Sequence, residues 1–218
     1  MKKMIFILSL FVLCMQFSAF AQKSRVGFFA GPVFSNMRGT VDSKNLNGDT
    51  KPGFAAGFIV DAPIKNHLSF QPALYYVHKG TITQKPLGPS QKDEISTELR
   101  YLDLALNVLY NTNGKGGNFF IGAGPYVSFN LPSKFLTKSP GNLKSESDIT
   151  FGNTIAEDFR GIDFGANFLM GYRLKGGFFV SANYSLGLRN LIPEGSLSTG
   201  DTKNNFIGVS LGWLVNNK

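Results

Sequence analysis

Apolar and polar residues alternate along most of this chain with a period of two. Residues 162–173 show the pattern in full. One parity carries Ile162, Phe164, Ala166, Phe168, Met170 and Tyr172. The other parity carries Asp163, Gly165, Asn167, Leu169, Gly171 and Arg173. This period is typical of β-strands with two unlike faces, and no stretch sustains a helical period. The pattern therefore predicts an all-β fold.

The alternation predicts eight strands that are long for a globular protein. They cover residues 24–37, 52–62, 67–82, 97–111, 118–131, 159–173, 177–190 and 204–215. Each has about ten residues or more, whereas ordinary strands average about five or six. A strand that crosses a bilayer at a tilt needs about nine to eleven residues. The strands are therefore long enough to cross a membrane.

The connections between these strands alternate between long and short. The long ones are residues 38–51, 83–96, 132–158 and 191–203, and the short ones are residues 63–66, 112–117 and 174–176. An up-and-down barrel in an outer membrane has short turns on the periplasmic side and long loops outside. We therefore predict an eight-stranded antiparallel up-and-down transmembrane β-barrel.

The first 21 residues have the organisation of a secretory signal peptide. Lys2 and Lys3 precede an apolar segment, and Ala19-Phe20-Ala21 fits a cleavage site. We predict a signal peptide at 1–21 and one barrel domain at 22–218. A retained anchor helix and a lipoprotein signal at Cys14 are the alternatives. Cys14 is the only cysteine, so the mature chain would have no disulfide and no cysteine-based metal site.

The alternation alone does not say which face of the barrel is apolar. A soluble lipocalin-like binder also has eight up-and-down strands after a signal peptide, with its apolar face inside. Here the polar parity is rich in glycine, which suits the crowded interior of a narrow barrel. The apolar parity is nearly free of charge through the middle of every strand, and Arg100, which shares this parity, lies at a strand end where it could snorkel. These features favour an apolar face turned outward to lipid.

Aromatic residues of the apolar parity gather at the strand ends. The predicted inner girdle comprises Phe28, Phe70, Tyr110, Phe119, Tyr172, Phe178 and Trp213. The predicted outer girdle comprises Phe34, Phe54, Tyr76, Phe129 and Phe164. Two such rings are typical of the membrane interfaces of outer-membrane barrels. Pro32, Pro72 and Pro125 lack a backbone donor and are predicted to mark bulges or positions near a rim.

Several segments together resemble a known family. They are Val26–Gly31, Leu68–Tyr76, Leu99–Leu106, Phe119–Tyr126 and Phe206–Trp213. In order and spacing they are similar to the small outer-membrane barrels of Bacteroidetes-type bacteria, the PorT-like outer membrane protein beta-barrel domain group. The resemblance covers residues 24–215. It implies a barrel similar to the OmpA and OmpX types, inserted by the barrel assembly machinery, and it implies no single activity.

The polar parity also carries charges that would point into the lumen. The candidates are Arg25, Asp61, Lys79, Asp103, Asp163, Arg173 and Arg189. Neighbouring strands could pair Arg25 with Asp61, Lys79 with Asp103, and Asp163 with Arg189. The prediction is a structural polar network that fills a narrow barrel, and a proton or ion path is the alternative.

The sequence offers little for catalysis or for a cofactor. Its two histidines are His67, in a predicted inner turn, and His78, near the predicted outer rim. No metal site, phosphate loop or nucleophile–base set is recognisable. We therefore predict no enzyme activity, no cofactor and no metal, with a rim enzyme that uses His78 for action on lipid or peptide as an alternative.

The charge pattern bears on partners. The net charge is +8, and +6 without Lys2 and Lys3, but the cations are scattered and form no stripe for nucleic acid. The predicted partners are outer-membrane lipids, the barrel assembly machinery, and a protein or glycan ligand at the outer loops. We predict a membrane protein of the cell outer membrane with a structural, interaction or assembly role. An accessory role in secretion or small-solute uptake is the alternative.

Overall fold

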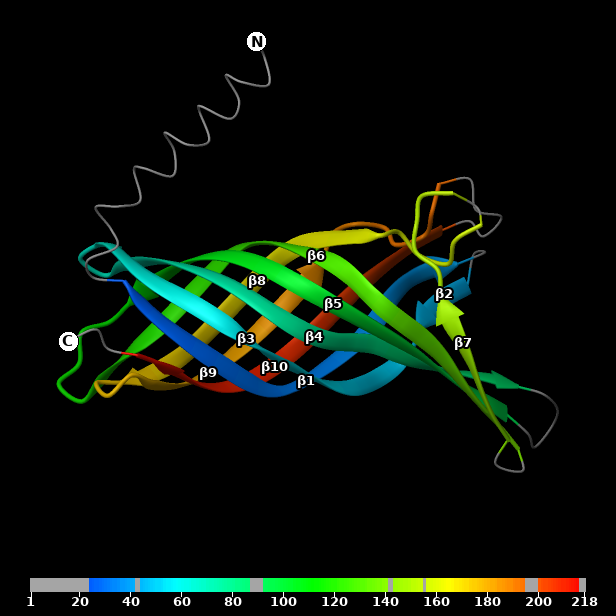
Figure 1. Cartoon of the computed structure of the whole chain (residues 1–218), viewed down its shortest axis with the longest axis horizontal. Coiled ribbons are helices and arrows are strands. Elements are labelled where there is room, and N and C mark those ends of the chain that lie inside the picture. Colours follow the sequence, from blue (N-terminus) through cyan, green and yellow to red (C-terminus); the bar gives the residue numbers. More distant parts are fainter. Residues whose placement is uncertain are drawn as a thin grey trace, which may run out of the picture.

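The computed structural model describes residues 24–41, 44–86, 92–140, 143–154, 156–194 and 200–215. The predicted signal peptide at 1–21 lies outside these residues. Ten strands form one antiparallel sheet (Figure 1). They are β1 (Arg25–Val41), β2 (Lys44–Asn47), β3 (Asp49–Lys65), β4 (Leu68–Pro86), β5 (Lys92–Asn111), β6 (Gly117–Ser139), β7 (Leu143–Ile149), β8 (Ile162–Leu174), β9 (Phe178–Gly187) and β10 (Gly200–Leu214). The predicted all-β antiparallel fold is confirmed.

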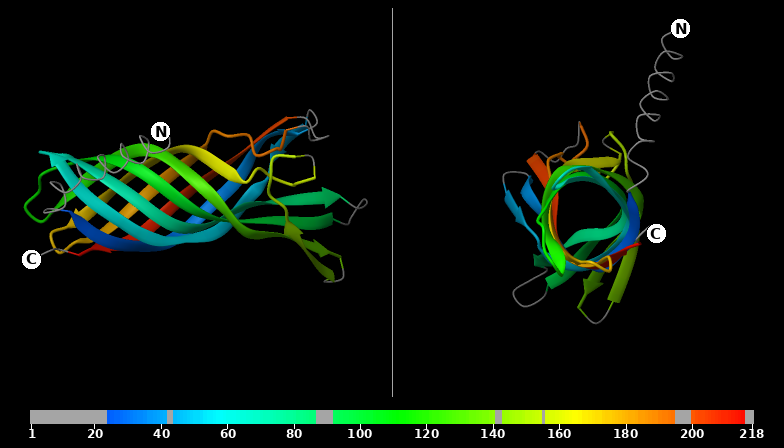
Figure 2. Two further views of the ribbon diagram at one scale, coloured as in Figure 1. Left: turned by 45° about the horizontal axis from the view of Figure 1, so that its top comes forward. Right: turned by 90° about the vertical axis from the view of Figure 1, so that its left-hand side faces the viewer.

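The sheet closes on itself. The strands follow one another in the order β1-β3-β4-β5-β6-β8-β9-β10, and β10 pairs back onto β1 from Gly27↔Leu214 to Val41↔Gly200. The end-on view in Figure 2 shows the resulting ring. Two short strands lie outside it, since β2 pairs with β1 and β7 pairs with β6. Because the sheet is closed, each ring strand has a neighbour on both sides. Its backbone N–H and C=O groups can therefore form hydrogen bonds without leaving an exposed sheet edge.

The alternating sequence pattern becomes an inside and an outside. On β10, Ile207 and Leu211 are each 55% exposed. Ser210 and Leu214, which lie on the opposite face of the strand, are buried. Every ring strand repeats this. Exposed apolar side chains from the eight strands include Phe28, Phe58, Leu74, Leu106, Ile121, Phe168, Val180 and Leu211. A soluble barrel would bury this face, so the outward apolar surface excludes the lipocalin-like arrangement.

The apolar surface has the height of a membrane core. On β1 it runs from Val26 to Phe34, and on β5 from Leu102 to Tyr110. At about 3.3 Å per residue and a tilt of about 40°, each stretch rises roughly 20–25 Å, close to the ~25 Å apolar band of outer-membrane barrels. Among the described residues, no helix is long and apolar enough to cross a membrane.

The three strand prolines sit in unbroken register. Of the two predicted explanations, a bulge or a position near a rim, the bulge is therefore wrong. Pro32 opposes Phe54, Pro72 opposes Leu106 and Pro125 opposes Ala166 without a shift in pairing. A proline costs only the hydrogen bond on the side to which its nitrogen points, because each residue of an antiparallel pair bonds to one neighbour.

Glycines beside two of these prolines allow neighbouring strands to approach closely. A Cβ at Gly31 would clash with the Val209 carbonyl oxygen, and one at Gly124 would clash with the Leu106 carbonyl oxygen. Any side chain there would push the strands apart. Glycine on the inner parity therefore serves strand contact as well as filling of the narrow lumen.

Several strands continue beyond the predicted ends and form a sheet outside the ring. β4 and β5 pair as far as Pro86↔Lys92, and β6 runs to Ser139 before β7 turns back along it. The predicted loops at 83–96 and 132–158 therefore contain strands. Figure 1 shows these hairpins projecting from the end opposite the chain termini of the barrel. We call this extension the outer platform. It comprises residues 81–86 of β4, 92–98 of β5, 133–139 of β6 and the whole of β7.

A bulge marks the point where the ring ends and the outer platform begins. The β5–β6 pairing shifts between Glu98 and Arg100. The Arg100 amide donates to the Ser133 hydroxyl at 3.0 Å, and that hydroxyl donates to the Leu131 carbonyl at 2.7 Å. The predicted strand ends at 97 and 131 coincide with this bulge. A bulge bends the strand and strengthens its twist, which lets the hairpin leave the barrel wall.

Candidate functional site

The inner mouth of the barrel holds a three-residue ion cluster. Arg25 Nη2 and Arg173 Nη1 both donate to Asp61 Oδ2 at 2.7 Å. Asp61 is 1% exposed, and the Arg173 side chain is 7% exposed. The predicted ion pair of Arg25 with Asp61 is present in the structure. The second partner, Arg173, comes from β8 on a different part of the ring, so one carboxylate links three strands across the lumen.

Amide side chains complete this cluster. Arg173 donates from Nη2 to Asn111 Oδ1 at 2.9 Å and from Nε to Asn118 Oδ1 at 3.3 Å. Asn111 also donates to the Ser69 hydroxyl at 3.0 Å. The cluster forms the floor of a hollow of about 440 Å³ that opens between the short turns. Sequence reasoning missed both asparagines, although they lie on the inward parity at strand ends.

Removing the shared carboxylate should destabilise the barrel. Asp61→Asn would leave the buried guanidinium of Arg173 and the partly buried one of Arg25 without a counter-charge. We expect a loss of about 3 kcal/mol, within the range for breaking a buried ion pair. Urea unfolding in lipid vesicles measures it. Asn118→Ala is the matched control. It removes no charge but two hydrogen bonds, one accepted from Arg173 Nε at 3.3 Å and one donated to Asn111 Oδ1 at 3.0 Å, and should cost about 1–2 kcal/mol. Equal midpoints for the two variants would contradict the role of Asp61.

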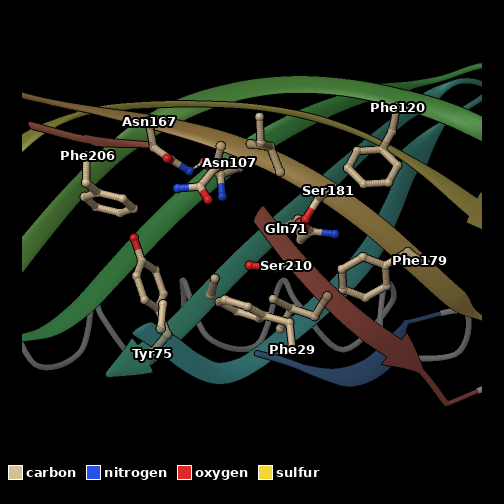
Figure 3. Close-up of a pocket in the computed structure, with 15 residues that line it drawn as sticks. Phe29, Gln71, Tyr75, Asn107, Phe120, Asn167, Phe179, Ser181, Phe206 and Ser210 are labelled. Atoms are coloured by element: carbon tan, nitrogen blue, oxygen red, sulfur yellow. Dashed lines mark hydrogen bonds between the residues drawn. The ribbon is translucent and has the colours of Figure 1, made fainter. Parts of the chain in front are cut away.

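The middle of the lumen is packed by aromatic rings and amides around a cavity of about 50 Å³ (Figure 3). Phe120 and Phe179 meet edge to face with centroids 6.4 Å apart. Asn167 donates to Asn107 at 3.1 Å and accepts from Ser185 at 3.0 Å. A cavity of this size has room for a few waters but not for a continuous channel. The described side chains therefore obstruct the lumen at mid-height.

A buried lysine dominates the next layer outward. Lys79 Nζ lies 2.8 Å from Asp103 Oδ2, and the two side chains are 1% and 0% exposed. The predicted ion pair of Lys79 with Asp103 is therefore present in the structure. The same ammonium donates to the Ser128 hydroxyl at 3.2 Å. It also lies 4.9 Å from the ring centre of Tyr101 and 5.1 Å from that of Tyr126. Ion pair and aromatic rings together fill this section of the barrel.

The predicted pair of Asp163 with Arg189 does not form. Asp163 is fully buried and lies in no ion pair among the described residues. Arg189 instead lies over the Phe164 ring, with Cζ 5.9 Å from its centre. The reason is local. β9 ends at Gly187, and the amides of Leu188 and Arg189 both donate to the Phe164 carbonyl, at 3.0 and 3.4 Å. Leu188 and Arg189 thus both lie opposite Phe164, as in a β-bulge, and this changes the direction in which the Arg189 side chain points.

A further ion group at the outer end of the lumen was missed from sequence. Lys51 Nζ donates to Ser96 Oγ at 2.7 Å and to Glu98 Oε1 at 3.0 Å. His78 Nε2 lies 3.8 Å from the other Glu98 oxygen, as does Arg100 Nη2. Lys51 and Ser96, which are both buried, fell in the predicted loops 38–51 and 83–96, so the sequence did not show that they face inward. Among the described residues, no three His, Cys, Asp or Glu side chains gather to hold a metal ion.

The aromatic residues predicted for the inner girdle all lie on strand ends next to the short turns. They are Phe28, Phe70, Tyr110, Phe119, Tyr172, Phe178 and Trp213. Phe119 and Tyr172 pack edge to face with centroids 4.7 Å apart. Trp213 opposes Phe28 on β1 and Phe178 on β9 in one register row. Five of the set are more than 40% exposed, with Phe70 and Tyr172 half-buried.

The outer platform carries opposite charges that pair across its strands. Lys138 Nζ lies 2.9 Å from Glu94, and Lys134 Nζ lies 2.9 Å from Glu146. The hydrogen bond that Lys134 donates to the Glu146 carboxylate raises the pKa of Lys134. All four side chains are at least 41% exposed, so the pairs contribute little to stability. The platform is a charged, hydrated surface with both signs interspersed.

The sequence of this chain matches an established family. The family model of the outer membrane protein beta-barrel domain covers residues 20–193. The match spans more than half of the chain, so the chain belongs to this family and is an outer-membrane β-barrel protein. The general family predicted from the sequence is confirmed, while the narrower PorT-like, Bacteroidetes-type group stays a prediction. No curated protein matches the chain in sequence.

Solved structures offer distant likenesses. Ail, the attachment invasion locus protein of Yersinia pestis, solved in complex with the heparin analogue sucrose octasulfate, has a TM-score of 0.43 and 11% identity, over 88% of this chain and 99% of Ail. Neisserial surface protein A has 0.42 and 11%, over 87% and 97%. The N-terminal barrel domain of Pseudomonas aeruginosa OprF has 0.34 and 11%, over 88% and 98%. The family assignment rests on the sequence match alone.

Proposed function

We propose that residues 22–218, freed of a signal peptide at 1–21, insert as an eight-stranded barrel through the barrel assembly machinery. The barrel acts by contact at its outer end and neither transports solutes nor catalyses a reaction. The inner and outer aromatic girdles lie at the two membrane interfaces. The charged lumen residues have structural rather than conducting roles; they are Arg25, Asp61, Lys79, Asp103, Asp163 and Arg173. The PorT-like group is the narrower family that the sequence segments favour.

The filled lumen is the observation that carries this proposal. Three successive layers obstruct it, namely the Asp61 cluster, the aromatic and amide layer, and the Lys79 layer. Each layer contains buried charged or bulky side chains that hold one another in place. A narrow eight-stranded barrel with such an interior has no free path for a solute. Transport through the lumen is therefore disfavoured over contact at the surface.

The outer platform supplies the surface for contact. It extends the β4–β5 and β6–β7 hairpins past the bulge at Glu98, and both faces of β7 are exposed. Residues 143–148 of β7 are all exposed. A protein or glycan ligand with hydrogen-bonding groups fits such a polar, charge-balanced surface better than an apolar one does.

Catalysis at the rim has little support. His78 is the candidate base, and its Nε2 has no hydrogen-bond partner among the described residues. The nearest carboxylate is Glu98 at 3.8 Å, and that group already binds Lys51. A hydrolytic site needs a base within hydrogen-bond reach of a nucleophile or an activated water. His67 lies in the inner turn and bonds to the Asn111 carbonyl at 2.8 Å.

A liposome swelling assay tests the closed lumen. Vesicles that contain the folded protein should not swell in isosmotic glucose, and planar bilayers should show no stepwise conductance. A porin of 16 strands in the same vesicles is the positive control, because barrels of that size leave an aqueous channel. Swelling above the level of protein-free vesicles would contradict the proposal and support a solute-uptake role.

A further inference from the structure

The outer wall of the barrel contains two hollows that share residues. The first, of about 340 Å³, lies at the outer end of β1 and is bounded by Phe34, Asn36 and Arg38 with Tyr184 and Ile207. The second, of about 290 Å³, continues from Tyr184 and Ile207 onto β8 and β6. We call the pair the wall groove. It crosses β1, β10, β9 and β8, which are consecutive in the ring (Figure 1).

A small residue makes the apolar half of the wall groove. Ala182 stands between Val209 on β10 and Met170 on β8 in one register row. Its neighbours are large, and Met170 is 58% exposed. In the next row, Tyr184 lies between Ile207 and Phe168. A methyl group among these long side chains leaves a hollow, which Phe168, Met170 and Tyr184 border.

The other half of the wall groove is polar and carries unbalanced positive charge. Arg38 is exposed, faces outward on the same side of β1 as Phe34, and forms no ion pair with any described residue. It lies directly across from Lys203 on β10. Lys203 Nζ is bound to Asp201 at 2.7 Å, so one carboxylate faces two cations. Asn36 and Thr50 add polar groups at the same end.

The two halves meet at the level where the apolar band ends. Phe34 is the last apolar outward residue on β1, and Asn36 and Arg38 follow it. A ligand that fills the wall groove must therefore be apolar below this level and anionic above it. Arginine binds phosphate through several hydrogen bonds in a fixed plane, and basic pockets at a membrane surface bind phosphorylated headgroups. An acyl chain fits the half over Ala182.

We propose that the wall groove binds one outer-leaflet lipid with a phosphate-bearing headgroup, with the phosphate at Arg38 and an acyl chain over Ala182. This site is more specific than the general contact of the barrel with lipid. It goes beyond the proposed function, because a barrel without a bound lipid would still span the membrane and keep its lumen closed.

Native mass spectrometry of the protein in a neutral maltoside detergent tests the proposal. The probes are phosphatidic acid, diacylglycerol with the same chains, and glycerol phosphate. We expect wild-type protein to retain one phosphatidic acid and neither of the other two. Arg38→Gln should weaken retention by about tenfold, the effect of losing one strong charge-assisted contact. Ala182→Phe should weaken it as well, by filling the hollow with an apolar ring that the lipid face tolerates.

Matched variants separate the wall groove from general effects. Lys144→Gln removes an exposed cation on β7, and Ala30→Phe adds a ring to an exposed outward position on β1 away from the groove. Both should retain the lipid as wild type does. Slower migration of each variant after boiling shows that it had folded. Equal retention by Arg38→Gln and Lys144→Gln, equal binding of diacylglycerol, or equal binding of glycerol phosphate without chains would each overturn the proposal.

Discussion

Lys79→Met is expected to lower the free energy of unfolding of the barrel by about 3–5 kcal/mol, the cost of breaking a buried ion pair from one side. The reason is the charge balance of the layer around Lys79. Asp103 lies 2.8 Å from the ammonium, and Asp163 is fully buried in the same part of the lumen. Without the lysine, two buried carboxylates have no cation in this layer.

Urea titration in lipid vesicles, followed by the loss of fast migration on an unheated gel, measures the effect. The double variant Lys79→Met/Asp103→Leu should regain most of the stability, because a well-packed apolar pair replaces a buried ion pair at little or no cost. An unfolding midpoint for Lys79→Met equal to that of the wild type would show that the ammonium does not hold this layer together.

Leu106→Arg should also destabilise the protein, by about 2–4 kcal/mol, as a cation does at the middle of the bilayer. Leu106 lies halfway along the outward apolar stretch of β5 between Leu102 and Tyr110 and is 40% exposed. In a water-soluble barrel an exposed arginine would cost little. The same urea titration measures the change, with Leu106→Ala as a control for lost side-chain contacts.

Leu143→Arg is the matched comparison. Leu143 is more exposed, at 70%, and begins β7 on the outer platform, outside the apolar band. We expect its free energy of unfolding to stay within about 0.5 kcal/mol of that of the wild type, as for most surface substitutions. If the two arginine variants lost the same stability, the outward face of β5 would not be lipid-facing.

The ring strands could be predicted from sequence because lipid and lumen impose unlike faces. Between residues 162 and 173 the alternation is complete, and β8 spans Ile162–Leu174. The prediction failed on the outer platform, where residues 143–148 of β7 are all exposed and β5 and β6 show no regular alternation of apolar and polar residues. Beyond the bulge at Glu98, β5 and β6 continue as the outer platform. There Leu136 shares one face of β6 with Lys134 and Lys138, so that face is not apolar. Strands without one apolar face give no period-two signal.

The lumen pairs show a second limit. Arg25 and Asp61 lie opposite each other on adjacent strands, so neighbour reasoning could find them. Arg173 reaches the same carboxylate although it is 112 residues away from Asp61 in sequence, on a strand that does not pair with β3. Contacts across a barrel depend on its diameter and shear, which single-strand patterns do not contain. The Asp163–Arg189 pair failed for a local reason, the end of β9 at Gly187.

Cell fractionation combined with gel migration tests the membrane barrel most directly. The protein should sediment with the outer membrane and run faster on a detergent gel when unheated than after boiling. This difference should disappear once the ring, which the pairing of β10 with β1 closes, is unfolded. A protein that is found only in the soluble periplasm, with the same migration before and after boiling, would contradict it.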